Sequence, residues 1–133
     1  MTVFLDTSAI LAVLNGDDQC HPEADAIWRR LLETEEPLLS SNYVLVELFA
    51  LAQRRLGMAA VRSVELEIVP LLDVHWLDAE IHHDAVTAWL AASRRSLSLV
   101  DFSSFEVMRR HKVRRAFAFD GHFEEYGFDL LRA

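Results

Sequence analysis

Several features that define other classes of protein are missing from this chain of 133 residues. Its single cysteine, Cys20, excludes an internal disulfide bond and fits a reducing compartment. Four glycines and three prolines leave little room for linkers, so we expect a single domain over residues 1–133. No apolar run approaches the roughly 20 residues of a membrane-spanning helix, and no signal-like segment follows a basic flank at the amino terminus. We therefore expect a cytoplasmic protein that has no membrane partner.

Positive charge is also scarce in this sequence. Thirteen Lys and Arg stand against 21 Asp and Glu, which gives a net charge of −8. Proteins that bind nucleic acid through phosphate contacts usually have a basic surface, so this balance argues against non-specific coating of nucleic acid. Basic residues nevertheless gather within 109–115, either as a local phosphate rim or as a solvated helix end that complements the helix dipole.

Apolar residues make up 52% of the chain, which is enough for a globular core. Short apolar segments alternate with segments of helical periodicity. The expected strands cover 3–5, 38–40, 68–72 or slightly beyond, 116–119 and, at an edge, 128–131. The expected helices cover 9–14, 22–34, 43–56, 58–67, 79–93 and 99–111. This alternation predicts an α/β fold with a mostly parallel sheet of about five strands flanked by helices.

Four carboxylates stand out because apolar sequence surrounds them. They are Asp6, Glu47, Asp101 and Asp120. Asp6 and Asp120 each follow an expected strand, so we expect both at the carboxyl edge of the sheet, where ligands bind in open α/β folds. Glu47 is the only charge in the apolar run 43–52, and Asp101 lies at the start of a helix.

Each of these acids also has a purely structural explanation. Asp6 or Thr7 fits a helix cap that accepts hydrogen bonds from backbone N–H groups, and Glu47 fits the solvent side of an amphipathic helix. Asp101 suits the first turn of a helix because of the helix dipole, and Asp120 with the following glycine suits a turn. These explanations leave unexplained why two strands both end on Asp and why the most apolar helix carries one acid.

Convergence of the four acids would restrict their chemistry. Carboxylates packed together repel one another and raise their own pKa values unless a cation neutralises them. Ligation by oxygen alone suits Mg²⁺ or Mn²⁺, which keeps several waters and takes further ligands from a substrate phosphate. Such a site supports in-line displacement at phosphorus, and its metal lets an acidic protein attract a polyanion.

Four parts of the sequence are distinctive together: DTSAILAVL from Asp6, the lone Glu47, SLVDFSSFEVMRRH from Ser98 and AFAFDGHFEEYGF from Ala116. In these segments the chain resembles the PIN-domain family, and within it the VapC-type toxins of bacterial and archaeal toxin–antitoxin pairs. It covers nearly the whole chain and implies a three-layer PIN-like fold. It also implies a metal-dependent endoribonuclease that uses Mg²⁺ or Mn²⁺, forms a homodimer and is inhibited by a cognate antitoxin.

The resemblance also assigns roles to individual residues. The catalytic and metal-binding acids are Asp6, Glu47, Asp101 and Asp120, with contacts to the ion made directly or through water. The supporting polar residues are Thr7, Ser8 and Ser103. Apart from the resemblance, His122 is a candidate substrate contact because it lies close to Asp120 in the sequence, and Arg109 and Arg115 are candidates from the basic cluster 109–115. We expect activated water to hydrolyse RNA phosphodiesters and to leave 5′-phosphate and 3′-hydroxyl ends.

Two other functions remain as alternatives. A catalytically silent PIN-type module would bind RNA or protein without turnover, and we would expect it to lack one of the four acids. An aspartyl-phosphate phosphatase would need a second Asp two residues after the first, where this chain has Ser8. A zinc site at His82 and His83 is disfavoured because adjacent residues point in different directions on a helix.

Overall fold

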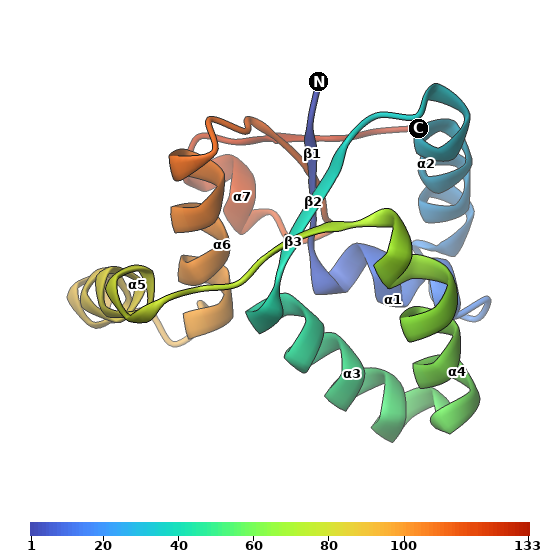
Figure 1. The fold of residues 1–133 in the computed structure, drawn as a ribbon, viewed down its shortest axis with the longest axis horizontal. Coiled ribbons are helices and arrows are strands. Elements are labelled where there is room, and N and C mark those ends of the chain that lie inside the picture. Colours follow the sequence, from blue (N-terminus) through green and yellow to red (C-terminus); the bar gives the residue numbers. More distant parts are fainter.

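A computed structural model describes residues 1–133 and contains one five-stranded sheet whose neighbouring strands all pair in parallel (Figure 1). The strands are β1 (Val3–Leu5), β2 (Leu38–Ser41), β3 (Asp73–His75), β4 (Arg115–Phe117) and β5 (Asp129–Leu130). The helices are α1 (Thr7–Leu14), α2 (His21–Thr34), α3 (Asn42–Leu56), α4 (Met58–Ser63), α5 (Ala79–Ala92), α6 (Leu99–Arg110) and α7 (His122–Glu125). A π-helical turn, η1 (Val64–Ile68), and a 3₁₀ turn, η2 (Val69–Leu71), connect α4 to β3. None of the helices is long and apolar enough to cross a membrane.

The strand order changes direction between β1 and β4. The order is β3-β2-β1-β4-β5, so the chain first adds β2 and β3 on one side of β1 and then crosses to the other side. The crossing runs through α5 and α6, and β4 then pairs with β1. Open α/β sheets bind ligands at such a switch point, outside the carboxyl ends of the strands.

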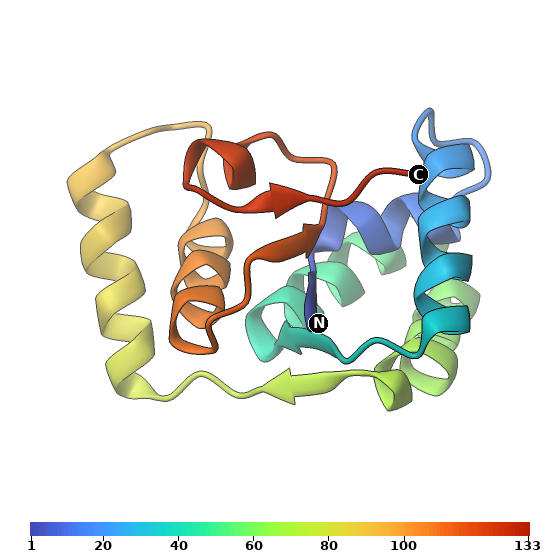
Figure 2. The same cartoon turned by 90° about the horizontal axis from the view of Figure 1, so that it is seen from above.

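Helices cover both faces of the sheet, which gives three layers (Figure 2). Successive side chains of β1 point to opposite faces. Val3 and Leu5 pack with α1, α2 and part of α3, whereas Phe4 packs with α6 and α7 on the other face. All three β1 side chains have no exposed surface. The continuous apolar run therefore reflects a strand buried on both faces.

An aromatic cluster places α6 and α7 relative to each other. The Phe105 ring of α6 stacks on Tyr126, with 4.7 Å between the ring centroids, and also stacks on Phe128 at 5.7 Å. Phe123 of α7 meets the same ring edge to face at 5.2 Å. Because Phe105 and Phe123 are fully buried, this cluster holds the segment after β4 against α6.

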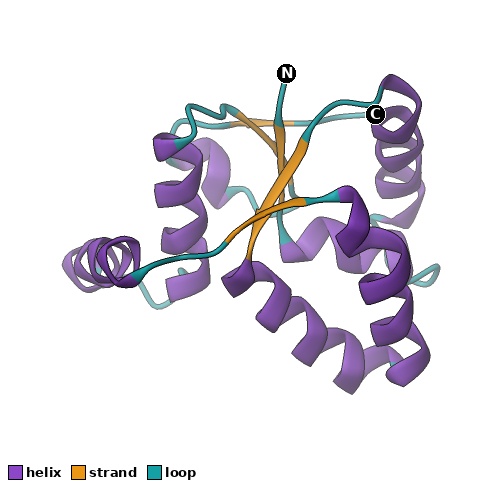
Figure 3. Cartoon of the chain, viewed as in Figure 1, coloured by secondary structure: helices purple, strands orange, loops and turns teal.

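The α/β fold with a parallel sheet is as predicted, but some expected boundaries were wrong (Figure 3). The apolar segment 68–72 is mostly helical, and β3 begins only at Asp73. Val64 and Ile68 are buried on one side of the π-helical turn, so the chain stays helical through this apolar stretch. β4 ends at Phe117, two residues early, because the backbone N–H of Phe119 donates to the Ser8 hydroxyl. The short helix α7 was not predicted.

Candidate active site

The four acids lie on segments that begin at the carboxyl edge of the sheet. Asp6 immediately follows β1, and Asp120 comes shortly after the end of β4, the neighbouring strand. Asp101 lies in the first turn of α6, and Glu47 lies in α3, which begins directly after β2. Figure 1 shows α1, α3 and α6 beginning on the same side of the sheet. The fold therefore places all four acids toward the switch point.

Asp6 is buried and caps α1. Its carboxylate Oδ2 accepts hydrogen bonds from the Ser8 hydroxyl at 2.6 Å and from the Ser8 backbone N–H at 3.2 Å. Burial raises the pKa of Asp6 to about 6, although both hydrogen bonds from Ser8 lower it. The negative charges of Asp101 and Glu47 raise this pKa further, so these carboxylates repel that of Asp6.

Ser8 connects the ends of β1 and β4. Its hydroxyl donates to Asp6 and accepts the backbone N–H of Phe119 at 3.0 Å. Phe119 directly precedes Asp120 in the chain. Ser8 thus holds the Asp6 carboxylate and also the backbone just before Asp120. Both contacts suit its predicted role as a supporting polar residue.

Asp101 lies at the amino terminus of α6 in a capping box. Its Oδ2 accepts the Ser98 backbone N–H at 2.8 Å, and the Ser98 hydroxyl accepts the Asp101 backbone N–H at 3.1 Å. Burial raises the pKa of Asp101, and the charge of Asp120 raises it further, whereas the bonds from Ser98 and the proximity of His122 lower it. Because Ser98 occupies only Oδ2, the other oxygen of Asp101 remains available to a ligand.

Asp120 and His122 form a close group with Asp101. One carboxylate oxygen each from Asp101 and Asp120 and one ring nitrogen of His122 lie within 4.8 Å of one another. The Oδ1 atom of Asp120 accepts the backbone N–H of His122 at 2.9 Å and lies 2.6 Å from the His122 Nδ1 atom. These three side chains are close enough to share one metal ion.

Glu47 lies near the start of α6, and Thr7 lies next to Asp6. Glu47 is half-buried and lines a hollow together with Val100, the residue before Asp101. Thr7 is buried next to Asp6, and its hydroxyl has no hydrogen-bond partner within the chain. A buried hydroxyl without a partner beside repelling carboxylates fits a site completed by a cation and water. The donor set is oxygen with one imidazole, which suits a divalent ion.

Other predicted residues do not join this group. The Ser103 hydroxyl donates to the Val100 carbonyl at 2.6 Å and thus bonds within its own helix. Arg109 lies in the last turn of α6, about 12 Å along the helix axis from Asp101. Arg115 begins β4 opposite Val3, at the amino edge of the sheet, and pairs with Glu36 at 2.9 Å. Because Arg109 and Arg115 lie away from the acids, we drop both as contacts to the scissile phosphate.

His122 was predicted only as a substrate contact, whereas the structure places it among the residues that would hold a metal. The available signal was its spacing, since Asp120 and His122 flank one glycine directly after a strand. Asp6 and Glu47 were predicted as metal ligands but lie outside the closest group. Asp6 is linked to that group electrostatically, because the charge of Asp101 raises the pKa of Asp6, and the charge of Glu47 raises the same pKa.

Comparisons with known proteins identify the relatives of this chain and its fold. Residues 3–129 match the family model described as PIN domain. The chain is 34% identical over 132 residues to the 23S rRNA-specific endonuclease VapC20 of Mycobacterium tuberculosis, covering 98% of both chains. The crystal structure of that VapC20, described as a sarcin-ricin loop cleaving toxin, matches with a TM-score of 0.84 and 33% identity over 98% of this chain and 99% of the other. DNA-bound VapBC from Salmonella typhimurium shares the fold with a TM-score of 0.68 and 19% identity, over 98% of both chains.

Proposed function

Because the chain belongs to the PIN-domain family, we propose that it is a metal-dependent endoribonuclease and the toxin of a toxin–antitoxin pair. The observation that carries this proposal is the set of acids at the switch point of the sheet. Asp101 and Asp120 come together there with His122, and the charges of Asp101 and Glu47 raise the pKa of Asp6. Such an arrangement of acids is costly for stability and serves catalysis when a cation neutralises it.

Each acid has a distinct task in this mechanism. Asp101 and Asp120 would hold a divalent ion, Mg²⁺ or Mn²⁺, and Asp6 would contribute a third carboxylate directly or through water. When bound, the ion neutralises charge on the phosphoryl oxygens and lowers the pKa of water. Glu47, at the border of the site, orients the attacking water and accepts its proton. Ser8 holds the Asp6 carboxylate in place through the 2.6 Å hydrogen bond.

The reaction is hydrolysis of an RNA phosphodiester. The water oxygen attacks phosphorus, the bond between phosphorus and the 3′-oxygen breaks, and the leaving oxygen takes a proton. The products carry a 5′-phosphate and a 3′-hydroxyl, and the 2′-hydroxyl takes no part. The name of the VapC20 relative indicates 23S rRNA, so we propose a loop of ribosomal RNA as substrate. Sequence-specific recognition of RNA usually targets such unstacked loops.

We also propose a cognate antitoxin, a homodimer and a cytoplasmic location. Large apolar side chains are available for protein contacts, since Val46 is 69% exposed, Leu90 is 66% exposed and Trp76 is 72% exposed. Exposed apolar groups of this kind favour association. Light scattering of the purified chain would give a dimer mass if this is right, and a monomer mass over a wide concentration range would contradict it.

The direct test is RNA cleavage by the purified chain with Mg²⁺ or Mn²⁺, and with EDTA. The substrates are a ribosomal RNA loop and an unrelated hairpin. We expect cleavage of the loop that EDTA abolishes and that Asp101→Asn and Asp120→Asn lower by at least about a hundredfold. Asp17→Asn is a matched control, because this acid lies exposed in a turn away from the site.

The products and the binding data then separate the alternatives. Mapping of the ends should give 5′-phosphates, whereas 2′,3′-cyclic phosphates would contradict attack by water. Binding of the loop without cleavage, with metal present, would favour the catalytically silent module. Cleavage that persists in both Asn variants would point to a contaminating nuclease.

A further inference from the structure

We infer that His122 supplies a nitrogen ligand to the ion held by Asp101 and Asp120, so that this site takes Mn²⁺ in preference to Mg²⁺. The inference rests on the proposed function and narrows its cofactor. It concerns a residue that the sequence suggested only for substrate contact.

The geometry around the His122 ring carries the first step. The Nδ1 atom lies 2.6 Å from Asp120 Oδ1, yet this buried nitrogen has no hydrogen-bond partner, because the contact lacks the alignment of a hydrogen bond. Asp120 Oδ1 already accepts the backbone N–H of His122. Two neighbouring ligands of one octahedral ion lie roughly 3 Å apart when each bond is about 2.1 Å long. At 2.6 Å the nitrogen and the oxygen are a few tenths of an ångström closer than two such ligands, so one ion can bind both after a small widening of this contact.

The fold fixes this ring in place. His122 is the first residue of α7, and the next residue, Phe123, is fully buried against Phe105 and Phe128. The His122 side chain is 22% exposed. With its neighbour anchored in the core, the backbone that carries the imidazole is held beside Asp101 and Asp120.

The chemistry of the donor set carries the second step. Mg²⁺ prefers oxygen ligands in a near-ideal octahedron, whereas imidazole suits transition metals. A neutral imidazole also brings less negative charge than a carboxylate would at the same place. Two carboxylates and one imidazole therefore favour Mn²⁺ over Mg²⁺, and Co²⁺ is a suitable spectroscopic substitute.

Calorimetry on the metal-free chain tests this inference without any measurement of activity. The titrants are MnCl₂ and MgCl₂, and the proteins are the wild type, His122→Ala and His122→Asp. His83→Ala is the matched control, because His83 is an exposed histidine of α5. We expect His122→Ala to weaken Mn²⁺ binding by about 10- to 100-fold and Mg²⁺ binding by less than about threefold. His122→Asp should tighten Mg²⁺ binding, because all three ligands are then oxygen.

The visible spectrum of bound Co²⁺ gives a second readout that is independent of affinity. Loss of the nitrogen ligand should shift the absorption bands in His122→Ala but not in His83→Ala. Equal Mn²⁺ affinity and an unchanged Co²⁺ spectrum in His122→Ala would overturn the inference and leave the proposed ribonuclease intact. Failure of the wild type to bind Mn²⁺ would also overturn the inference about His122. The proposed metal dependence of the ribonuclease is tested separately, because RNA cleavage that persists in EDTA would contradict it.

Discussion

Asp6 is at once a helix cap and a member of the acidic site. Its carboxylate accepts two hydrogen bonds from Ser8 at the start of α1, as an ordinary cap does. The same carboxylate is buried and repelled by two other acids, which raises its pKa. The capping and site interpretations of the sequence are therefore compatible at this residue. The same holds for Asp101, which forms a capping box and also approaches Asp120.

The raised pKa of Asp6 predicts how the stability of the metal-free protein depends on pH. Burial raises this pKa from 3.8 to about 6, so the folded state binds the proton more tightly than the unfolded state. The free energy of unfolding should fall as pH rises from about 4 to 6 and stay lower above pH 6. The group alone accounts for about 3 kcal/mol.

Urea unfolding in EDTA at pH 4 to 7 measures this effect. Asp6→Asn should lose this part of the pH dependence and be the more stable protein at pH 7, because no charge is then buried. Asp17→Asn is the matched control, since Asp17 is exposed. Equal pH profiles for the wild type and Asp6→Asn would contradict the prediction.

Replacement of Ser8 should disturb both stability and the site. In Ser8→Ala the Phe119 N–H loses its partner and Asp6 loses its shortest hydrogen bond. We expect the free energy of unfolding to fall by about 1–2 kcal/mol and RNA cleavage to fall as well. Chemical denaturation and the cleavage assay measure the two effects. Ser96→Ala, at an exposed turn, should change neither, and an unaffected Ser8→Ala would remove Ser8 from the site.

The site residues differed in how far sequence could predict them. The four acids are recognisable because apolar sequence surrounds them, where a charge is uncommon, although each alone also suits a cap, a turn or a helix surface. The positions of Arg109 and Arg115 were not recognisable, because closeness in sequence to Asp101 or Asp120 says nothing about which end of a helix or strand faces the site. α6 runs from the carboxyl edge toward the amino edge, which carries Arg109 away from Asp101 (Figure 1).

Elements were predicted best where periodicity and caps agree. α3 begins after Ser41, whose hydroxyl accepts the Val44 N–H, and ends at Gly57, as the sequence indicated. The segment 68–72 failed because a short apolar run suits a buried helical face as well as a strand. Only tertiary packing of Val64 and Ile68 decides between the two.

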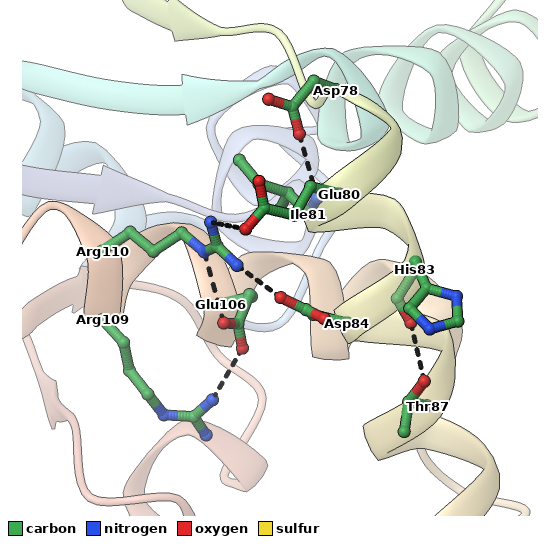
Figure 4. A network of polar contacts seen from close by, with 9 residues as sticks. All are labelled: Asp78, Glu80, Ile81, His83, Asp84, Thr87, Glu106, Arg109 and Arg110. Carbon is green, nitrogen blue, oxygen red and sulfur yellow. Dashed lines mark hydrogen bonds and ion pairs between the residues drawn. The ribbon is translucent and has the colours of Figure 1, made fainter.

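Helix α5 lies at the periphery and packs mainly on α6 (Figure 2). Arg110 joins the two helices, as Figure 4 shows. Its guanidinium contacts Asp84 at 2.6 Å, Glu106 at 3.3 Å and Glu80 at 3.9 Å. One cation thus faces three carboxylates, two of them on α5.

Removal of this cation should loosen α5. We expect Arg110→Met to lower the free energy of unfolding by about 1 kcal/mol, because the side chain is partly exposed and three acids are left to repel one another. Urea denaturation at low salt and at 1 M NaCl measures this, and high salt should shrink the difference. Arg29→Met is the matched control, because Arg29 contacts only Asp25 on its own helix, and it should have at most half the effect. A salt-independent loss in Arg110→Met would instead indicate lost packing.

At the scale of the whole molecule, the charge balance restricts how RNA is held. The net charge is −8, and Arg109, Arg110 and Arg115 are paired with acids away from the site. These three cations are therefore not placed to contact phosphates near the carboxylates. RNA binding should therefore depend on the divalent ion more than on arginine and lysine.

Glu47→Gln allows this to be measured, because it keeps Asp101, Asp120 and His122 while slowing cleavage. We expect EDTA to weaken RNA binding by the Glu47→Gln variant by at least about tenfold. We also expect a plot of log affinity against log salt concentration to have a slope shallower than about −3. Fluorescence anisotropy with a labelled loop gives both quantities. Tight binding in EDTA with a steep slope would show that a basic surface elsewhere holds the RNA.

The pairing of β1 with β4 bears on when activity can arise during synthesis. Ser8 and Phe119, which join the ends of these strands, lie 111 positions apart in the chain. A nascent polypeptide that has emerged only as far as α6 carries Asp6, Glu47 and Asp101 but neither β4 nor Asp120. Such a product cannot assemble the proposed site. A prematurely terminated toxin would consequently be harmless to the cell that makes it, and toxicity would begin only after the last strands have been translated.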